Sequence, residues 1–106
     1  MGAIIKVVDD DFKEEKTYEY VDDKTLDQIV AAAQENGSAF LGFVLGYENT
    51  CFNSAQMDEI LKELETIGKI LEDPKCQKII KTINDAIEFA LNDPPSYLLF
   101  EGDWSL

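Results

Sequence analysis

Two long helical patterns, separated by one sharp break, occupy the second half of the chain. In each pattern apolar residues recur every three or four positions, which places them along one face of a helix. The first consists of Met57, Ile60, Leu61, Leu64, Ile67 and Leu71, and the second of Cys76, Ile79, Ile80, Ile83, Ile87 and Ala90. Asp73-Pro74 lies between them, and Asp favours the cap of a helix while Pro favours its first position. We expect two consecutive helices, the first beginning at Asn53–Ser54 and the second ending before Pro94-Pro95.

The N-terminal part of the chain has the shorter patterns of β-strands. Ala3–Val8 is a β-branched run that predicts a strand. Thr17–Val21 predicts a second strand, with Tyr18 and Tyr20 on one face and Glu19 on the other. The connection between the two runs is short and acidic, so we expect a β-hairpin.

A helical stripe and a highly apolar run follow the hairpin. The stripe contains Leu26, Ile29, Val30 and Ala33. It begins after Asp22-Asp23 and ends at Asn36-Gly37, where glycine tolerates a positive φ. Ala39–Leu45 is nearly all apolar and predicts a central strand buried on both faces. Asn49–Phe52 and Tyr97–Phe100 predict shorter strands.

The resulting element order is ββαβ(β)ααβ, which determines the expected fold class. We predict one α+β domain over residues 1–106, with three helices packed on one face of a mainly antiparallel sheet. An apolar content of 45% is enough for a core at this length.

The charge balance limits the partners of this domain. The chain has 22 acidic residues, 9 lysines, no arginine and no histidine, for a net charge of −13. Such a field repels nucleic acid and anionic membranes, whose phosphates need lysine and arginine. It attracts basic proteins and speeds encounter with them, although solubility alone would account for the charge equally well. No apolar run reaches the length of a membrane span, and a cytoplasmic protein is expected.

Residues that carry catalysis or hold metals are scarce. Histidine is absent, and no nucleophile elbow, P-loop or dinucleotide fingerprint occurs. Cys51 and Cys76 form no CxxC pair and are expected to be buried free thiols. Asp9-Asp10-Asp11 could begin a Ca²⁺ or Mg²⁺ site, but the EF-hand glycine is missing and a solvated turn is favoured. We therefore expect no enzyme activity, no cofactor and no metal.

Acidic residues crowd the stretch from Asp9 to Asp27, most of it in the predicted hairpin. They suit an acidic docking rim, and equally the protection of an edge strand by charge. Aromatic residues beside acids suit a binding hot spot for a basic partner. The candidate partner-binding residues, all expected in turns or tails, are Asp10, Asp11, Glu14, Glu15, Tyr47 and Trp104.

Four segments carry a resemblance to a known group of proteins. They are Met1-Gly2 with its strand and acidic turn, Leu26–Val30 in a helix ending at Asn36-Gly37, Cys51-Phe52-Asn53-Ser54 opening a helix through Ile60–Ile67, and Tyr97–Phe100 after a helix and a proline. In this order they resemble the immunity proteins of bacterial polymorphic-toxin and contact-dependent growth inhibition systems, closest to the immunity protein 70 type.

The resemblance implies a cytoplasmic, non-catalytic protein that neutralises a cognate basic toxin. The toxin is expected to be a nuclease domain whose substrate-binding surface the inhibitor occupies or covers. The alternatives are an acidic nucleic-acid mimic and a small regulatory adaptor. Lysines interleaved among the helical acids argue against the mimic, which should space its acids like phosphates along one face.

Overall fold

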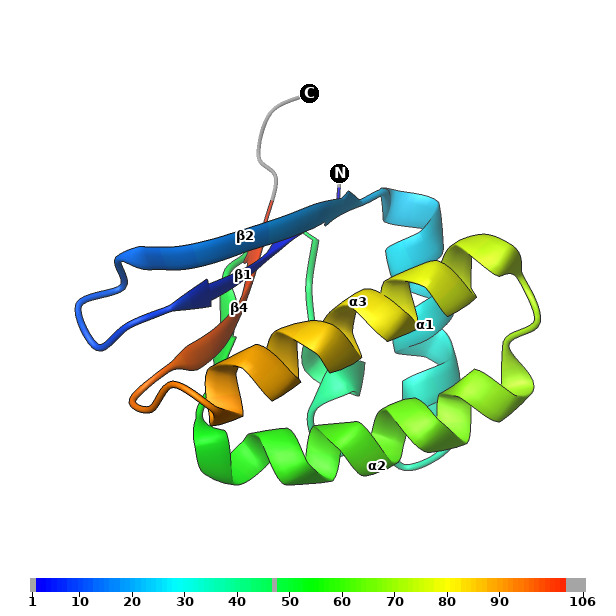
Figure 1. Cartoon of the computed structure of the whole chain (residues 1–106). Helices are drawn as coiled ribbons and strands as arrows, with labels where there is room; N and C mark the ends of the chain where they lie inside the picture. Colours follow the sequence, from blue (N-terminus) through cyan, green and yellow to red (C-terminus); the bar gives the residue numbers. More distant parts are fainter. Residues whose placement is uncertain (1, 47, 103–106) are drawn as a thin grey trace.

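A computed structural model describes residues 2–46 and 48–102 and shows a sheet with helices on one side (Figure 1). The elements are β1 (Ala3–Val8), β2 (Glu14–Val21), α1 (Asp23–Glu35), a 3₁₀ helix η1 (Leu41–Phe43), β3 (Thr50–Phe52), α2 (Ser54–Ile70), α3 (Pro74–Leu91) and β4 (Tyr97–Gly102). Within the described residues the strands form one antiparallel sheet of order β2-β1-β4-β3. The predicted α+β class with a mainly antiparallel sheet is confirmed.

The core lies between the sheet and the helices. Ile5 of β1 pairs with Phe100 of β4, and both side chains are fully buried in the core cluster. The helices add the apolar faces that the sequence predicts, including Ile60 and Ile83. Because neighbouring strand residues point to opposite faces, Ile4, Lys6 and other alternate residues face away from the helices.

The helix ends lie where the capping residues place them. The side chain of Asp22 accepts the amide hydrogen of Thr25 at the start of α1. Asn53 forms a reciprocal capping box with Gln56 at the start of α2, and Asp73 caps α3 with Pro74 at its first position. These caps lie at the starts of the three predicted helices, which the structure confirms.

Strand β2 departs from simple alternation. Its register with β1 shifts between Ile4 and Lys6, so Tyr18 and Glu19 lie together opposite Ile5 in a β-bulge. Tyr18 packs against the core, whereas Tyr20, paired with Ile4, is on the opposite face and 48% exposed. The prediction that the two tyrosines share a face is therefore wrong, because periodicity alone does not reveal a bulge.

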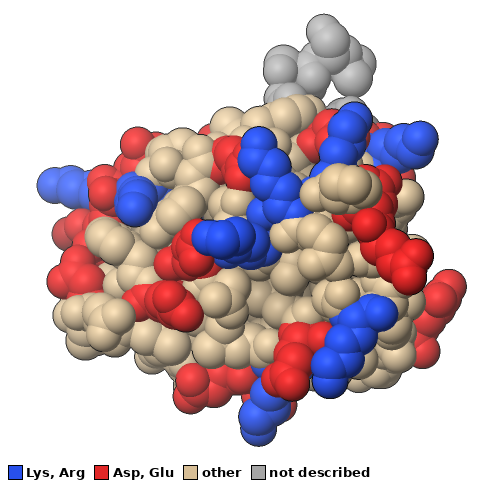
Figure 2. Space-filling view, turned by 45° about the vertical axis from the view of Figure 1, so that its right-hand side comes forward, with Lys and Arg blue, Asp and Glu red and all other residues tan. Residues whose placement is uncertain are grey.

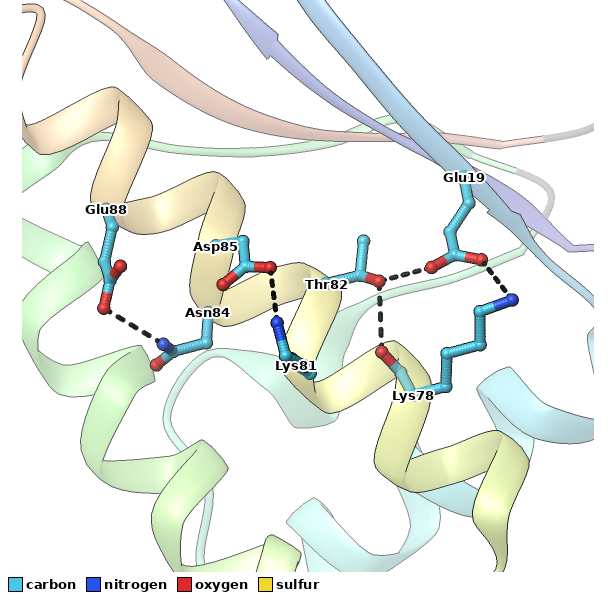
Figure 3. A network of polar contacts seen from close by, with 7 residues as sticks. All are labelled: Glu19, Lys78, Lys81, Thr82, Asn84, Asp85 and Glu88. Carbon is cyan, nitrogen blue, oxygen red and sulfur yellow. Dashed lines mark hydrogen bonds and ion pairs between the residues drawn. The ribbon is translucent and has the colours of Figure 1, made fainter.

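The bulge directs Glu19 toward α3 (Figure 3). Its carboxylate lies 3.3 Å from the Nζ atom of Lys78 and accepts a hydrogen bond from the hydroxyl of Thr82. These contacts tie the edge strand of the sheet to the helical layer.

The apolar run Ala39–Leu45 is not the central strand that was predicted. It contains η1, and β1 and β4 are the central strands. Leu41 and Val44 are buried, but Phe43 is 69% exposed.

Side chains, not a neighbouring strand, satisfy the backbone of this run. The carboxylate of Glu63 accepts from the amides of Ala39 and Leu41 at 3.2 and 2.9 Å and from the hydroxyl of Ser38. The hydroxyl oxygen of Ser38 in turn accepts from the amide of Gly42 at 2.9 Å. Hydrophobicity alone cannot distinguish a buried strand from a compact turn held in this way.

The start of β2 and the exposure of one cysteine differ from the sequence predictions. Strand β2 begins at Glu14, earlier than the predicted Thr17. Cys76 is buried as expected, but Cys51 is exposed on the edge strand β3, because its neighbour Phe52 takes the core position. No helix within the described ranges is long and apolar enough to cross a membrane.

Candidate functional site

The β1–β2 turn is held rigidly by its first aspartate. The Oδ1 atom of Asp9 accepts from the amides of Asp11 and Lys13, both at 2.9 Å. The backbone adds a bond from the Asp9 amide to the Lys13 carbonyl at 2.9 Å. Asp9 thus caps a turn, as aspartate side chains commonly do. Among the residues that the structure describes, no group of His, Cys, Asp or Glu could hold a metal ion.

Phe12 occupies an unusual position at the end of this turn. Its φ is 60°, in the left-handed region that favours glycine or asparagine and costs other residues about 1 kcal/mol. Its side chain is 66% exposed, and its ring stacks on Tyr97 of β4 with centroids 6.5 Å apart. The turn therefore displays an aromatic ring to solvent in a fixed orientation.

Two carboxylates without a charge partner among the described residues precede Phe12 in the turn. Asp10 and Asp11 are exposed in the turn, as the sequence predicts. Neither side chain has a hydrogen bond or ion pair within residues 2–46 and 48–102. An aromatic ring flanked by free carboxylates can stack on a cationic side chain and pair with its charge.

Glu14 lies in β2, not in the turn where it was expected, because the hairpin is tighter than predicted. Its Oε1 atom lies 3.0 Å from the Nζ atom of Lys6, which is 3.1 Å from Glu101 Oε2 of β4. Hydrogen bonds from Thr17 and Lys6 lower the pKa of Glu14, and those to Glu14 and Glu101 raise the pKa of Lys6. One lysine thus serves two carboxylates.

Glu15 also lies in β2 rather than a turn, and it contacts the corner before β4. Its Oε1 atom accepts from the hydroxyl of buried Ser96 at 2.6 Å. That bond lowers the pKa of Glu15, but nearby Asp93, lost hydration and Asp9 together outweigh it, so the pKa is raised. Glu15 is engaged within the fold and is a weaker candidate for partner contact.

The structure therefore brings together only some of the predicted site residues. Asp10 and Asp11 share the turn, and Glu14 is on the sheet face that points away from the helices. Tyr47 and Trp104 lie outside the described residues. Sequence reasoning missed Phe12, although a phenylalanine between the charged residues Asp11 and Lys13 of a predicted turn indicates an exposed ring.

A cavity between the end of α1 and α2 is a weaker candidate for a binding site than the acidic turn. Its volume is about 210 Å³. Its carboxylates, Glu59 and Glu63, are already bonded to Lys62 and to the segment from Ser38 to Leu41.

No family model, curated protein or solved structure matches the chain. The acidic turn with its exposed ring is therefore the candidate site on geometry and charge alone.

Proposed function

We propose that this chain is an inhibitor that binds and neutralises a basic protein, with the β1–β2 turn making the first contact. The partner implied by the sequence resemblance is a cytoplasmic toxin domain, expected to be a nuclease. The observation that carries the proposal is the exposed pair Asp10 and Asp11, uncompensated within the described residues, beside the exposed ring of Phe12.

The substrate-binding surface of a nuclease is cationic because it must bind phosphates. Carboxylates that reach this surface neutralise it, and the bulk of the inhibitor then excludes the nucleic acid. The net charge of −13 raises the encounter rate, while an aromatic anchor such as Phe12 slows dissociation.

Nucleic-acid mimicry is less well supported, because acids alternate with lysines over the helices. Figure 2 shows red and blue side chains interleaved on the face turned toward the right-hand side of Figure 1. Ion pairs join Glu59 to Lys62 at 3.2 Å and Lys81 to Asp85 at 3.2 Å. A mimic would present a continuous row of acids instead.

The test compares two double charge reversals with the same change in net charge. Asp10→Lys with Asp11→Lys alters the turn, and Asp58→Lys with Glu65→Lys alters the exposed surface of α2. The binding partner is a basic domain to be sought in the neighbouring reading frame and purified with its catalytic residues inactivated. We expect the turn variant to bind at least about tenfold more weakly and to lose protection of cells expressing the active domain. Equal losses in both folded variants would contradict the proposal.

A further inference from the structure

We propose that the docking surface extends from the turn across the whole sheet face opposite the helices, and that it fits a folded protein with mixed cationic and apolar side chains. We call this surface the open face. It rests on the proposed function for the nature of the partner, and adds where that partner binds and what chemistry it presents.

Strand register defines the members of the open face, because paired residues point to the same side of a sheet. They are Ile4, Lys6 and Val8 of β1, Glu14, Thr17 and Tyr20 of β2, Tyr97, Leu99 and Glu101 of β4, and Cys51 of β3. Val8 and Leu99 are buried yet lie outside the core cluster beneath the helices. Because both side chains are already buried, the face offers a partner the surface of its aromatic rings and not that of Val8 and Leu99.

Aromatic rings stand at both ends of the open face. Tyr20 is 48% exposed at one end, and Phe12 stacks on Tyr97 at the other. Tyrosine and phenylalanine provide large contact areas and commonly anchor interfaces.

The charge of the open face is negative although a lysine lies at its centre. Lys6 is shared between Glu14 and Glu101, so the three side chains together carry one net negative charge. The side chain of Lys6 is only 17% exposed. The side chains of Glu14 and Glu101 are 52% and 38% exposed. A partner's arginine or lysine can pair with these carboxylates while Lys6 stays in place.

This combination selects among occupants. A second copy of the chain is opposed by its own charge of −13. A flexible polycation would satisfy the carboxylates but would leave the exposed rings uncovered. A protein surface that alternates cationic and apolar side chains matches both properties.

The experiment uses two synthetic ten-residue peptides as probes, one of alternating arginine and valine and the other of arginine alone. Simple attraction to an acidic protein favours the all-arginine peptide, because it carries twice the charge. The open face predicts the reverse order of affinity, with the alternating peptide binding more tightly at physiological ionic strength.

Two substitutions locate the binding. Tyr20→Ala and Glu101→Gln should each weaken the alternating peptide about tenfold, since each removes an anchoring ring or a charged partner. Glu65→Gln on α2 is the control and should leave affinity unchanged. The same two substitutions also distinguish binding at the open face from binding at the edge strands β2 and β3. A peptide strand at an edge would bind through backbone hydrogen bonds, and neither substitution would change its affinity.

Cys51 provides a readout in the unaltered protein. It is exposed on the open face, whereas Cys76 is fully buried, so N-ethylmaleimide should label Cys51 selectively. The alternating peptide should slow this labelling at least about threefold at saturation, because shielding follows occupancy of the site.

Two results would overturn the proposal that the open face is a docking surface. One is equal or tighter binding of the all-arginine peptide, and the other is an affinity for the alternating peptide that neither Tyr20→Ala nor Glu101→Gln changes. The proposed function would then stand if the turn reversal still abolished binding of the inactivated basic domain. Failure of that domain to bind at all would instead remove the proposed function.

Discussion

The helical layer and the β-hairpin carry their charges in different ways. On α2 and α3, some acids and lysines pair within a single turn, as in Glu65–Lys69 at 3.8 Å and Lys81–Asp85 at 3.2 Å, the latter drawn in Figure 3. In the hairpin, Lys6 serves two carboxylates, and Asp10 and Asp11 have no partner within the described residues. Local pairing suits solubility, whereas uncompensated charge beside an exposed ring suits recognition of a cation.

The largest expected effect comes from removing the lysine that neutralises the hairpin. Lys6→Gln leaves Glu14 and Glu101 facing each other across the sheet, and we expect it to lower the free energy of unfolding by about 2 kcal/mol. Lys62→Gln removes an exposed helical pair with Glu59 and should cost at most about 0.5 kcal/mol. Urea denaturation of both variants provides the measurement. Equal losses of unfolding free energy would contradict the proposed difference between the hairpin and the helices.

A smaller effect of opposite sign is expected at Phe12. Phe12→Gly relieves the left-handed backbone but removes the stacking on Tyr97, so stability should stay level or rise by up to about 1 kcal/mol. Partner binding should nevertheless weaken, because the exposed ring is lost. Phe12→Ala, which removes the ring without relieving the backbone, is the matched control and should be less stable than Phe12→Gly in thermal denaturation. A glycine variant that binds normally would show that the ring has no role in recognition.

The smallest effects concern the adjacent acids Glu14 and Glu15, whose pKa values shift in opposite directions. The pKa of Glu14 is lowered by Thr17 and Lys6, so its stabilisation is present above the unfolded pKa and is lost as pH falls through the folded value. The pKa of Glu15 is raised, so this group disfavours the folded state at neutral pH and does so less as pH falls through its folded value.

Replacing each acid by glutamine separates the two effects. Glu14→Gln should lower the melting temperature at neutral pH, whereas Glu15→Gln should raise it and reduce the gain of stability on acidification. Melting curves recorded between neutral and mildly acid pH provide the comparison. Shifts of the same sign at neutral pH would contradict the opposed environments of the two side chains.

The sequence predicted most of the fold because its local signals are strong and agree. Asp22, Asn53 and Asp73 cap helices as predicted, and Ala3–Val8 is a strand with the predicted bounds. The strand predicted for Ala39–Leu45 is wrong because Glu63, distant in sequence, supplies the hydrogen-bond acceptors that fold the run into a turn. Such a long-range side-chain contact leaves no periodic trace.

The candidate site was only partly visible in the sequence. Charge crowding and turn composition were sufficient to predict that Asp10 and Asp11 lie exposed in a turn. The separate environments of Glu14 and Glu15 depend on strand register and on Ser96, which lies far along the chain. The open face depends on the pairing of β1 with both β2 and β4, which local patterns do not specify.

The most direct measurement of the central claim is the salt dependence of association with the inactivated basic domain. Attraction between opposite charges speeds encounter and is screened by salt. We predict that the association rate constant falls steeply between about 0.05 and 0.5 M salt, while dissociation changes less. Both variants keep a large net negative charge, but the Asp10→Lys, Asp11→Lys variant should show a clearly shallower salt dependence than the Asp58→Lys, Glu65→Lys variant, because it loses the charges nearest the partner. An association rate indifferent to salt, or the same salt dependence in both variants, would contradict a docking site centred on the hairpin.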